Sequence, residues 1–239
     1  MAGLRARLLA AMVAGALSGA ASALTLNVEL SGTAATAART LPVGRSLPAP
    51  PVDTRPVVAF GDSLTYGFGV TPDHSYPAVL QGLLGQPVIR LGFPGKGTAV
   101  GVAHLPDVLA LDPRLVVLAF GSVDACLAVP MATAAKNLDT ILTVLDAHHV
   151  PAVIVGTHLG PERVPKQPAC PSWVPYLQDW DSALTALAAR HGSGLVLDVL
   201  RGLGSQPDGY HPDLAGYAAM AERMVGAIRA VETIERLPL

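Results

Sequence analysis

The sequence predicts an α/β fold in which a parallel sheet carries helices on both faces. Three observations predict it. Short apolar runs alternate with longer amphipathic ones from residue 56 onward, the short runs are rich in Val, Ile and Leu without polar alternation, and polar motifs follow their ends. Such runs are typical of strands buried on both faces, and strand–helix alternation implies right-handed crossovers between parallel strands. With 239 residues, 51% of them hydrophobic, the chain is long enough for one domain with a full core.

The candidate strands share a short, uninterrupted apolar character and lie at residues 57–60, 88–91, 115–120, 152–157 and 194–199. The candidate helices share an amphipathic pattern and lie at residues 76–84, 98–110, 131–149 and 175–191. A last helix is expected from Pro212 to about residue 234. Proline suits the first turn of a helix, where its missing N–H costs nothing.

The first 26 residues are typical of an export signal. Arg5 and Arg7 precede an apolar stretch that runs to about residue 26, and Ala21-Ser22-Ala23 fits a small-x-small cleavage site. The rival interpretation is an uncleaved membrane anchor, since a span needs roughly 20 apolar residues. Residues 27–55 are rich in Thr, Ala and Pro and are expected to form a linker. We therefore expect an exported protein, periplasmic or extracellular or held at the membrane, with its folded domain at residues 56–239.

Charge and metal-ligand patterns exclude several function classes. The formal net charge is -2, which argues against a nucleic-acid partner bound by bulk electrostatics. The sequence contains no His-Glu-x-x-His and no Cys-x-x-Cys, so no metal site is expected. The two cysteines, Cys126 and Cys170, permit one disulfide in an exported protein, or two unrelated thiols.

Two short motifs at opposite ends of the domain supply a serine, a carboxylate and a histidine. Gly61-Asp62-Ser63-Leu64 follows the first strand, and Asp208-Gly209-Tyr210-His211-Pro212 precedes the last helix. These are the side chains of nucleophilic acyl transfer. A serine on a strand-to-helix turn has an exposed hydroxyl and a backbone N–H free to face an oxyanion. Taken alone, each motif also fits an ordinary turn leading into a helix; their presence together favours catalysis.

These motifs resemble the SGNH-hydrolase superfamily, also called the GDSL lipases and esterases. The resemblance covers residues 57–239 and is closest over 58–67, 75–80 and 208–212, the second of these being similar to lysophospholipase/thioesterase/arylesterase-type members. It implies a flavodoxin-like, three-layer α/β/α sandwich with a five-stranded parallel sheet, which agrees with the five candidate strands. It also implies that Ser63 is the nucleophile, that His211 is the general base, and that Asp208 orients the imidazole.

The same resemblance implies an oxyanion hole that is incomplete in this chain. Residues 91–98 stand where the family has Asn-x-Gly-x-x-Gly, with the preceding Arg90 in the asparagine position and Gly95 supplying a backbone N–H beside that of Ser63. The family's next block is Gly-x-Asn-Asp, but residues 121–124 read Gly-Ser-Val-Asp, so Val123 replaces the asparagine donor. Loss of one such donor costs about 10²–10³ in turnover.

Three explanations for the missing donor are open. The Ser122 hydroxyl takes its place, the two backbone donors suffice for an activated ester, or the protein has drifted toward another role. The following residue, Asp124, matches an acidic residue of the family and is expected to be structural.

The loop after the fourth candidate strand opens at Thr157 and is expected to help form the substrate entrance. Cys170 lies on this loop and Cys126 just after the third strand. Adjacent strands bring both loops to one rim of the sheet, which favours a Cys126–Cys170 bridge.

The chain is thus expected to be an exported serine hydrolase that cleaves a carboxylic ester or thioester through an acyl-enzyme on Ser63. It needs no cofactor, since acyl transfer to water requires none. Its expected partner is a small-molecule or lipid ester, and it is expected to be a monomer that meets a membrane only through an uncleaved N-terminal segment. Two alternatives are an O-acetyltransferase or carbohydrate deacetylase of envelope polysaccharide, and a non-catalytic glycan- or lipid-binding domain.

Overall fold

Five strands form one parallel sheet in the computed structural model, which describes residues 53–157 and 173–235. The strands are β1 (Val57–Gly61), β2 (Val88–Gly92), β3 (Leu115–Ala119), β4 (Ala152–Val155) and β5 (Gly194–Val196). Their order across the sheet is β2-β1-β3-β4-β5, and every pairing is parallel. The predicted sheet is therefore confirmed. The predicted export segment, most of the linker and the predicted entrance loop lie outside the described residues.

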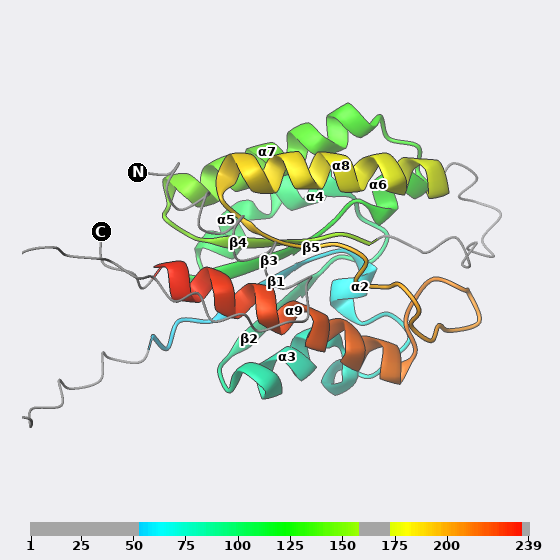
Figure 1. Ribbon diagram of the computed structural model, residues 1–239, viewed down its shortest axis with the longest axis horizontal. Helices are drawn as coiled ribbons and strands as arrows, with labels where there is room; N and C mark the ends of the chain where they lie inside the picture. Colours follow the sequence, from blue (N-terminus) through cyan, green and yellow to red (C-terminus); the bar gives the residue numbers. More distant parts are fainter. Residues whose placement is uncertain (1–52, 158–172, 236–239) are drawn as a thin grey trace, which may run out of the picture.

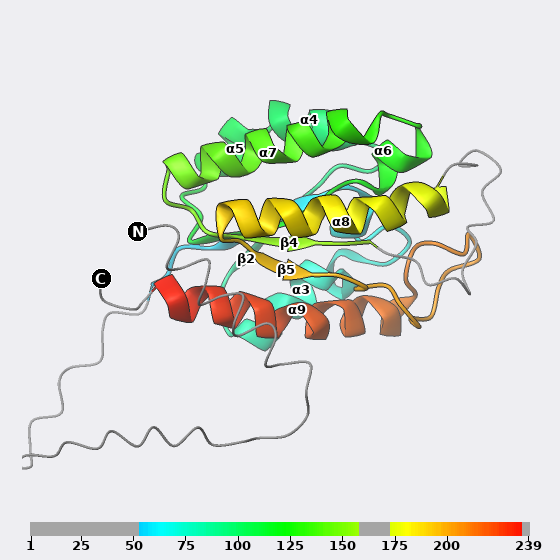
Figure 2. The same cartoon turned by 45° about the horizontal axis from the view of Figure 1, so that its top comes forward.

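Helices cover both faces of the sheet and produce three layers. The helical elements are α2 (Ser63–Tyr66), η1 (Pro72–His74), α3 (Tyr76–Leu84), α4 (Thr98–Ala103), α5 (Leu105–Leu109), α6 (Ser122–Cys126), α7 (Met131–Ala147), α8 (Trp173–His191) and α9 (Leu214–Glu235). Helices α3 and α9 lie on one face, and α4, α5, α7 and α8 lie on the other (Figures 1 and 2). In the described part of the chain, no helix combines the length and apolarity needed to cross a membrane.

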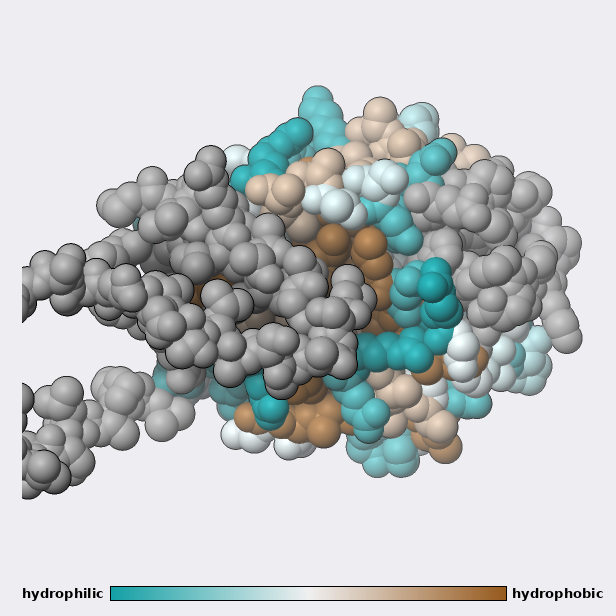
Figure 3. Space-filling view, in the orientation of Figure 1, coloured by the Kyte–Doolittle hydropathy of each residue, from teal (hydrophilic) through white to brown (hydrophobic). Residues whose placement is uncertain are grey.

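The core lies between these layers and explains the lack of polar alternation in the strands. Every residue of β1 and β3, which lie inside the sheet, is buried, whereas the edge strand β2 is half-buried throughout. Phe60 of β1 packs edge-to-face on Phe120, with ring centroids 5.0 Å apart. On the surface shown in Figure 3, hydrophobic residues gather near the middle, where the other edge strand, β5, runs between α8 and α9.

One predicted helix is wrong in detail. Residues 98–110 form two helices, α4 and α5, rather than one, and His104 lies at the junction. Pro106 stands in the first turn of α5. A proline has no N–H for the carbonyl of the preceding turn, and its ring excludes a continuous helix at that point.

The prediction for the start of the last helix is also wrong, because α9 begins at Leu214 and not at Pro212. Pro212 pairs with Ser205 in an isolated antiparallel bridge. Asp213 caps the helix instead, since its carboxylate accepts the Gly216 N–H at 2.7 Å.

The last two strands are shorter than predicted and end at Val155 and Val196. Asp198 has a φ of 56°, which no extended strand can accommodate.

Candidate active site

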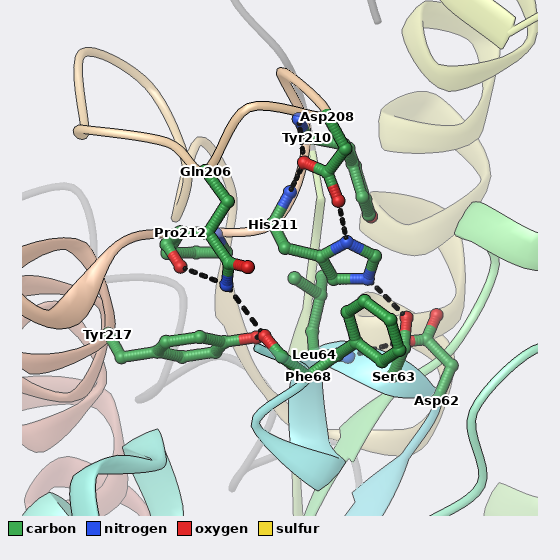
Figure 4. Close-up of polar contacts among 10 residues, drawn as sticks. All are labelled: Asp62, Ser63, Leu64, Phe68, Gln206, Asp208, Tyr210, His211, Pro212 and Tyr217. Atoms are coloured by element: carbon green, nitrogen blue, oxygen red, sulfur yellow. Dashed lines mark hydrogen bonds and ion pairs between the residues drawn. The ribbon is translucent and has the colours of Figure 1, made fainter. Parts of the chain in front are cut away.

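The serine, histidine and aspartate predicted from the two motifs meet at the carboxyl end of β1. Ser63 is the first residue of α2 and is separated from that strand by Asp62 alone, and Asp208 and His211 lie in the loop between β5 and α9. The His211 Nε2 lies 2.8 Å from the Ser63 Oγ, and the His211 Nδ1 lies 2.6 Å from the Asp208 Oδ2 (Figure 4). The structure therefore brings all three side chains together in the order that acyl transfer needs.

Gly61 and Asp62, the two residues before Ser63, fix the turn that presents the Ser63 side chain. A Cβ on Gly61 would lie 2.3 Å from the Ala119 carbonyl oxygen of β3, so only glycine fits this close approach. The next residue, Asp62, donates its N–H to the same carbonyl. Its carboxylate accepts the Leu64 N–H at 2.9 Å and caps α2. Ser63 is consequently fixed at the start of a capped helix.

The loop that carries His211 is organised by the Asp208 carboxylate. Its Oδ1 accepts the backbone N–H groups of Tyr210 at 2.9 Å and His211 at 3.0 Å, which leaves Oδ2 for the imidazole. Burial alone would raise the pKa of Asp208, but the hydrogen bonds from the His211 ring and from these two N–H groups outweigh it and lower that pKa. Asp208 is therefore an anion that can stabilise a charged imidazolium.

Two backbone N–H groups are available for an oxyanion. Neither the Ser63 N–H nor the Gly95 N–H has an acceptor among the described residues. Gly95 has a φ of 70°, a conformation that glycine adopts without strain. The loop around Gly95 leads into α4, whose first residue is Thr98. Asp124, which lies in α6, accepts both the N–H and the hydroxyl of Thr98, at 2.9 and 2.7 Å. Asp124 thus has the structural role predicted for it.

Ser122, the candidate third donor, is engaged with Asp62 in this structure. Its buried hydroxyl donates to the Asp62 Oδ2. A hydroxyl has one proton to donate, so a role of Ser122 in the oxyanion hole stays a prediction. Burial raises the pKa of Asp62 to about 6, although the hydrogen bonds from Ser122 and from the Leu64 N–H act in the opposite direction.

Ser122→Ala is expected to destabilise the protein more at pH 8 than at pH 4. The raised pKa of Asp62 means that folding favours its neutral form, so its contribution to stability is full below pH 3.8 and is lost as the pH rises through about 6. Removing the hydroxyl leaves the ionised carboxylate with one donor fewer. We expect an additional loss of about 1–2 kcal/mol at pH 8, measured by urea unfolding at the two pH values.

Ser75→Ala is the matched control for this measurement. Its hydroxyl is also buried, but it donates to the uncharged Pro72 carbonyl at 2.6 Å. The loss of stability in the control should not depend on the ionisation of Asp62. Equal losses for Ser122→Ala at both pH values would contradict the expected role of its hydroxyl.

Three more residues complete the description of the site: Cys126, which the sequence analysis named, and Phe68 and Gln206, which it did not. Cys126 ends α6, but Cys170 lies outside the described residues, so the bridge stays a prediction. The motifs did not single out Phe68 or Gln206, which lie beside the segments that carry Ser63 and His211 (Figure 4). The Phe68 ring packs on the His211 imidazole with centroids 4.6 Å apart. The aromatic residue five positions after Ser63 could have been recognised in the sequence as a ring close to the site, whereas nothing in the sequence distinguished Gln206.

The geometry agrees with a comparison of the whole chain against protein families. A family model described as the GDSL-like lipase/acylhydrolase family matches residues 59–219. The chain belongs to this family. It is accordingly a serine hydrolase that acts on ester bonds, and the fold predicted from the resemblance is confirmed. The comparison does not favour the transferase, deacetylase or binding-domain alternatives.

Solved structures with the same fold include other hydrolases of the SGNH type. TesA is 25% identical with a TM-score of 0.64, over 74% of this chain and 99% of its own. AlinE4, an SGNH-hydrolase family esterase, is 26% identical with a TM-score of 0.55, over 80% of this chain and 100% of its own. The M. smegmatis aryl esterase is 18% identical with a TM-score of 0.63, over 74% of this chain and 99% of its own, and shows the fold alone. The search of curated proteins found no match.

Proposed function

We propose that this GDSL hydrolase is an exported esterase that cleaves carboxylic esters or thioesters through a covalent acyl-enzyme on Ser63. The observation that carries the proposal is the continuous hydrogen-bonded chain from the Asp208 carboxylate through His211 to the Ser63 hydroxyl, with distances of 2.6 and 2.8 Å. The esterase AlinE4 supports ester substrates, because it shares the fold at 26% identity.

In the first half-reaction, the Ser63 Oγ attacks the carbonyl carbon of the ester. Its proton moves to the His211 Nε2, and the Nδ1–H remains hydrogen-bonded to Asp208. The carbonyl oxygen becomes an oxyanion, which the N–H groups of Ser63 and Gly95 stabilise. The tetrahedral intermediate then expels the alcohol or thiol, which takes the proton from Nε2.

In the second half-reaction, water attacks the acyl group on Ser63. His211 accepts a proton from the water and returns it to the serine oxygen as the carboxylic acid leaves. Two backbone donors suffice for an ester with an activated leaving group, because such a leaving group departs more easily and the barrier is lower. The absence of an asparagine at Val123 therefore favours activated esters as the first substrates to test.

The experiment that tests the mechanism is direct trapping of the acyl group. We expect that incubation with p-nitrophenyl acetate, followed by acid quenching and peptide mass spectrometry, finds an acetyl group on the peptide that contains Ser63. The butyrate and octanoate esters then report which acyl chain the site accepts. Ester turnover with no acyl group on Ser63, or with the acyl group on another residue, would contradict the proposed mechanism.

The proposal that the enzyme is exported rests on its first 26 residues. Arg5 and Arg7 before an apolar stretch, and the Ala21-Ser22-Ala23 segment, support secretion. The mass of the protein recovered from a secreting host distinguishes a cleaved signal from a retained anchor.

A further inference from the structure

Gln206 lies between the two segments that carry the nucleophile and the general base. Its side-chain Nε2 donates to the Phe68 carbonyl at 2.7 Å and to the Pro212 carbonyl at 2.9 Å. Phe68 belongs to the segment after Ser63, and Pro212 directly follows His211. One amide group therefore uses both of its N–H donors to join the two halves of the catalytic site (Figure 4).

The same connection continues through the backbone on both sides. The Phe68 N–H donates to the Ser63 carbonyl at 3.0 Å, which ties the Phe68 main chain to the nucleophile. The Gln206 N–H donates to the His211 carbonyl at 2.8 Å, which ties Gln206 to the base. A short series of hydrogen bonds thus runs from the Ser63 main chain to the His211 main chain, and its central member is the Gln206 side chain.

The contacts of the Gln206 amide with Gly69 and of the Phe68 carbonyl with Tyr217 further restrain this arrangement. A Cβ on Gly69, which has a φ of 83°, would lie 1.8 Å from the Gln206 Oε1, so the amide group fits there only because residue 69 has no side chain. The Phe68 carbonyl also accepts the Tyr217 hydroxyl at 3.1 Å. The Phe68 ring packs on the His211 imidazole although the residue is 46% exposed, and the two hydrogen bonds to its carbonyl hold the main chain from which the ring projects.

We infer that Gln206 is a positioning residue, which sets the distance between the Ser63 hydroxyl and the His211 imidazole by clamping the Phe68 and Pro212 carbonyls together. This inference rests on the proposed roles of Ser63 and His211. The hydrogen bond between the Ser63 Oγ and the His211 Nε2 joins residues 148 positions apart. The turn geometry of either motif alone cannot set the distance between these two atoms. A displacement of about 1 Å between reacting groups can cost up to about 100-fold in rate.

Gln206→Met tests the inference because methionine has a similar length and no N–H donor. We expect kcat for p-nitrophenyl acetate to fall about 10- to 100-fold with KM nearly unchanged. The rate at which a p-nitrophenyl alkylphosphonate inactivates the enzyme should fall by the same factor. That rate reports the attack of Ser63 alone, without any deacylation step.

Arg223→Met is the matched control. The Arg223 Nη1 donates to three carbonyls of the chain segment that precedes Gln206, those of Asp198, Val199 and Arg201, but not to the segment after Ser63. We expect this variant to lower Tm at least as much as Gln206→Met while kcat stays within about twofold of the parent value. If the two variants lose activity in proportion to their loss of Tm, Gln206 has only a structural role and the inference is wrong.

A double-mutant cycle with Tyr217→Phe tests the route through Phe68. The Tyr217 hydroxyl holds the Phe68 carbonyl only in part once Gln206 is replaced. Removal of both donors should therefore lower kcat by more than the product of the two separate factors. Independent effects would overturn the inference.

Phosphonate labelling of Ser63 in the parent separates this inference from the proposed function. If Ser63 is not labelled at all, the proposed mechanism fails. If it is labelled at the same rate in the parent and in Gln206→Met, only the positioning role fails.

Discussion

Ser63→Ala is expected to lower kcat for p-nitrophenyl ester hydrolysis by a factor on the order of 10⁴ or more. In the proposed mechanism the Ser63 Oγ forms the covalent bond to the substrate, and the substitution removes this atom. His211 and Asp208 lie in sequence beyond the Ser63 Oγ, at 2.8 Å from Ser63 and 2.6 Å from His211, and do not take its place. Only the slow attack of water, assisted by the oxyanion donors, remains. The measurement is the steady-state release of p-nitrophenol, with substrate binding followed separately by inhibition with a non-hydrolysable analogue.

Ser75→Ala serves as the control for this prediction as well. Ser75 is buried like Ser63, but its hydroxyl serves only the turn at Pro72. The control should retain kcat, although it loses some stability. Turnover in Ser63→Ala within about tenfold of the parent value would mean that another group performs the attack.

Asp208→Asn has the second-largest expected effect, a loss of about 10⁴ in kcat. The amide keeps an oxygen for the Tyr210 and His211 N–H groups, so the loop should keep its shape. The amide cannot stabilise a charged imidazolium, and its NH₂ group favours the imidazole tautomer that has its proton on Nε2. In that tautomer His211 cannot accept the proton of Ser63.

Asp213→Asn is the neighbouring control for Asp208→Asn. Asp213 caps α9 through the Gly216 N–H, and asparagine is an equally good helix cap. Its kcat and Tm should stay near the parent values. A similar loss of activity in both variants would show that a general change in charge, rather than the orientation of His211, controls the rate.

The group formed by Ser63, His211 and Asp208 could be predicted from the sequence because its signals are local. Gly61, Asp62 and Ser63 occupy one strand-to-helix turn, and Asp208 orients His211 across three residues. Turn chemistry of this kind is decided by neighbours in the chain. The break at Pro106 was also a local signal, but the apolar period on both sides of it suggested one continuous helix.

The roles of Ser122 and Gln206 could not be predicted in the same way. The motif comparison indicated that a donor is missing at Val123 and suggested the Ser122 hydroxyl in its place. The structure instead pairs that hydroxyl with Asp62, which is 60 positions away. The bond from Gln206 to Phe68 joins residues 138 positions apart, and no spacing in the sequence connects them.

The sequence by itself determined the α/β class, the number of strands and the identity of the three side chains that meet at the carboxyl end of β1. Hydrophobic period and turn residues act over a few neighbouring positions, so they can be recognised before any packing is known. Only the tertiary structure decided how close Ser63 and His211 lie, which donors remain free for an oxyanion, and which amide joins the two segments. These features depend on hydrogen bonds between distant segments, whose geometry exists only once the sheet has brought the carboxyl ends of its strands to one edge.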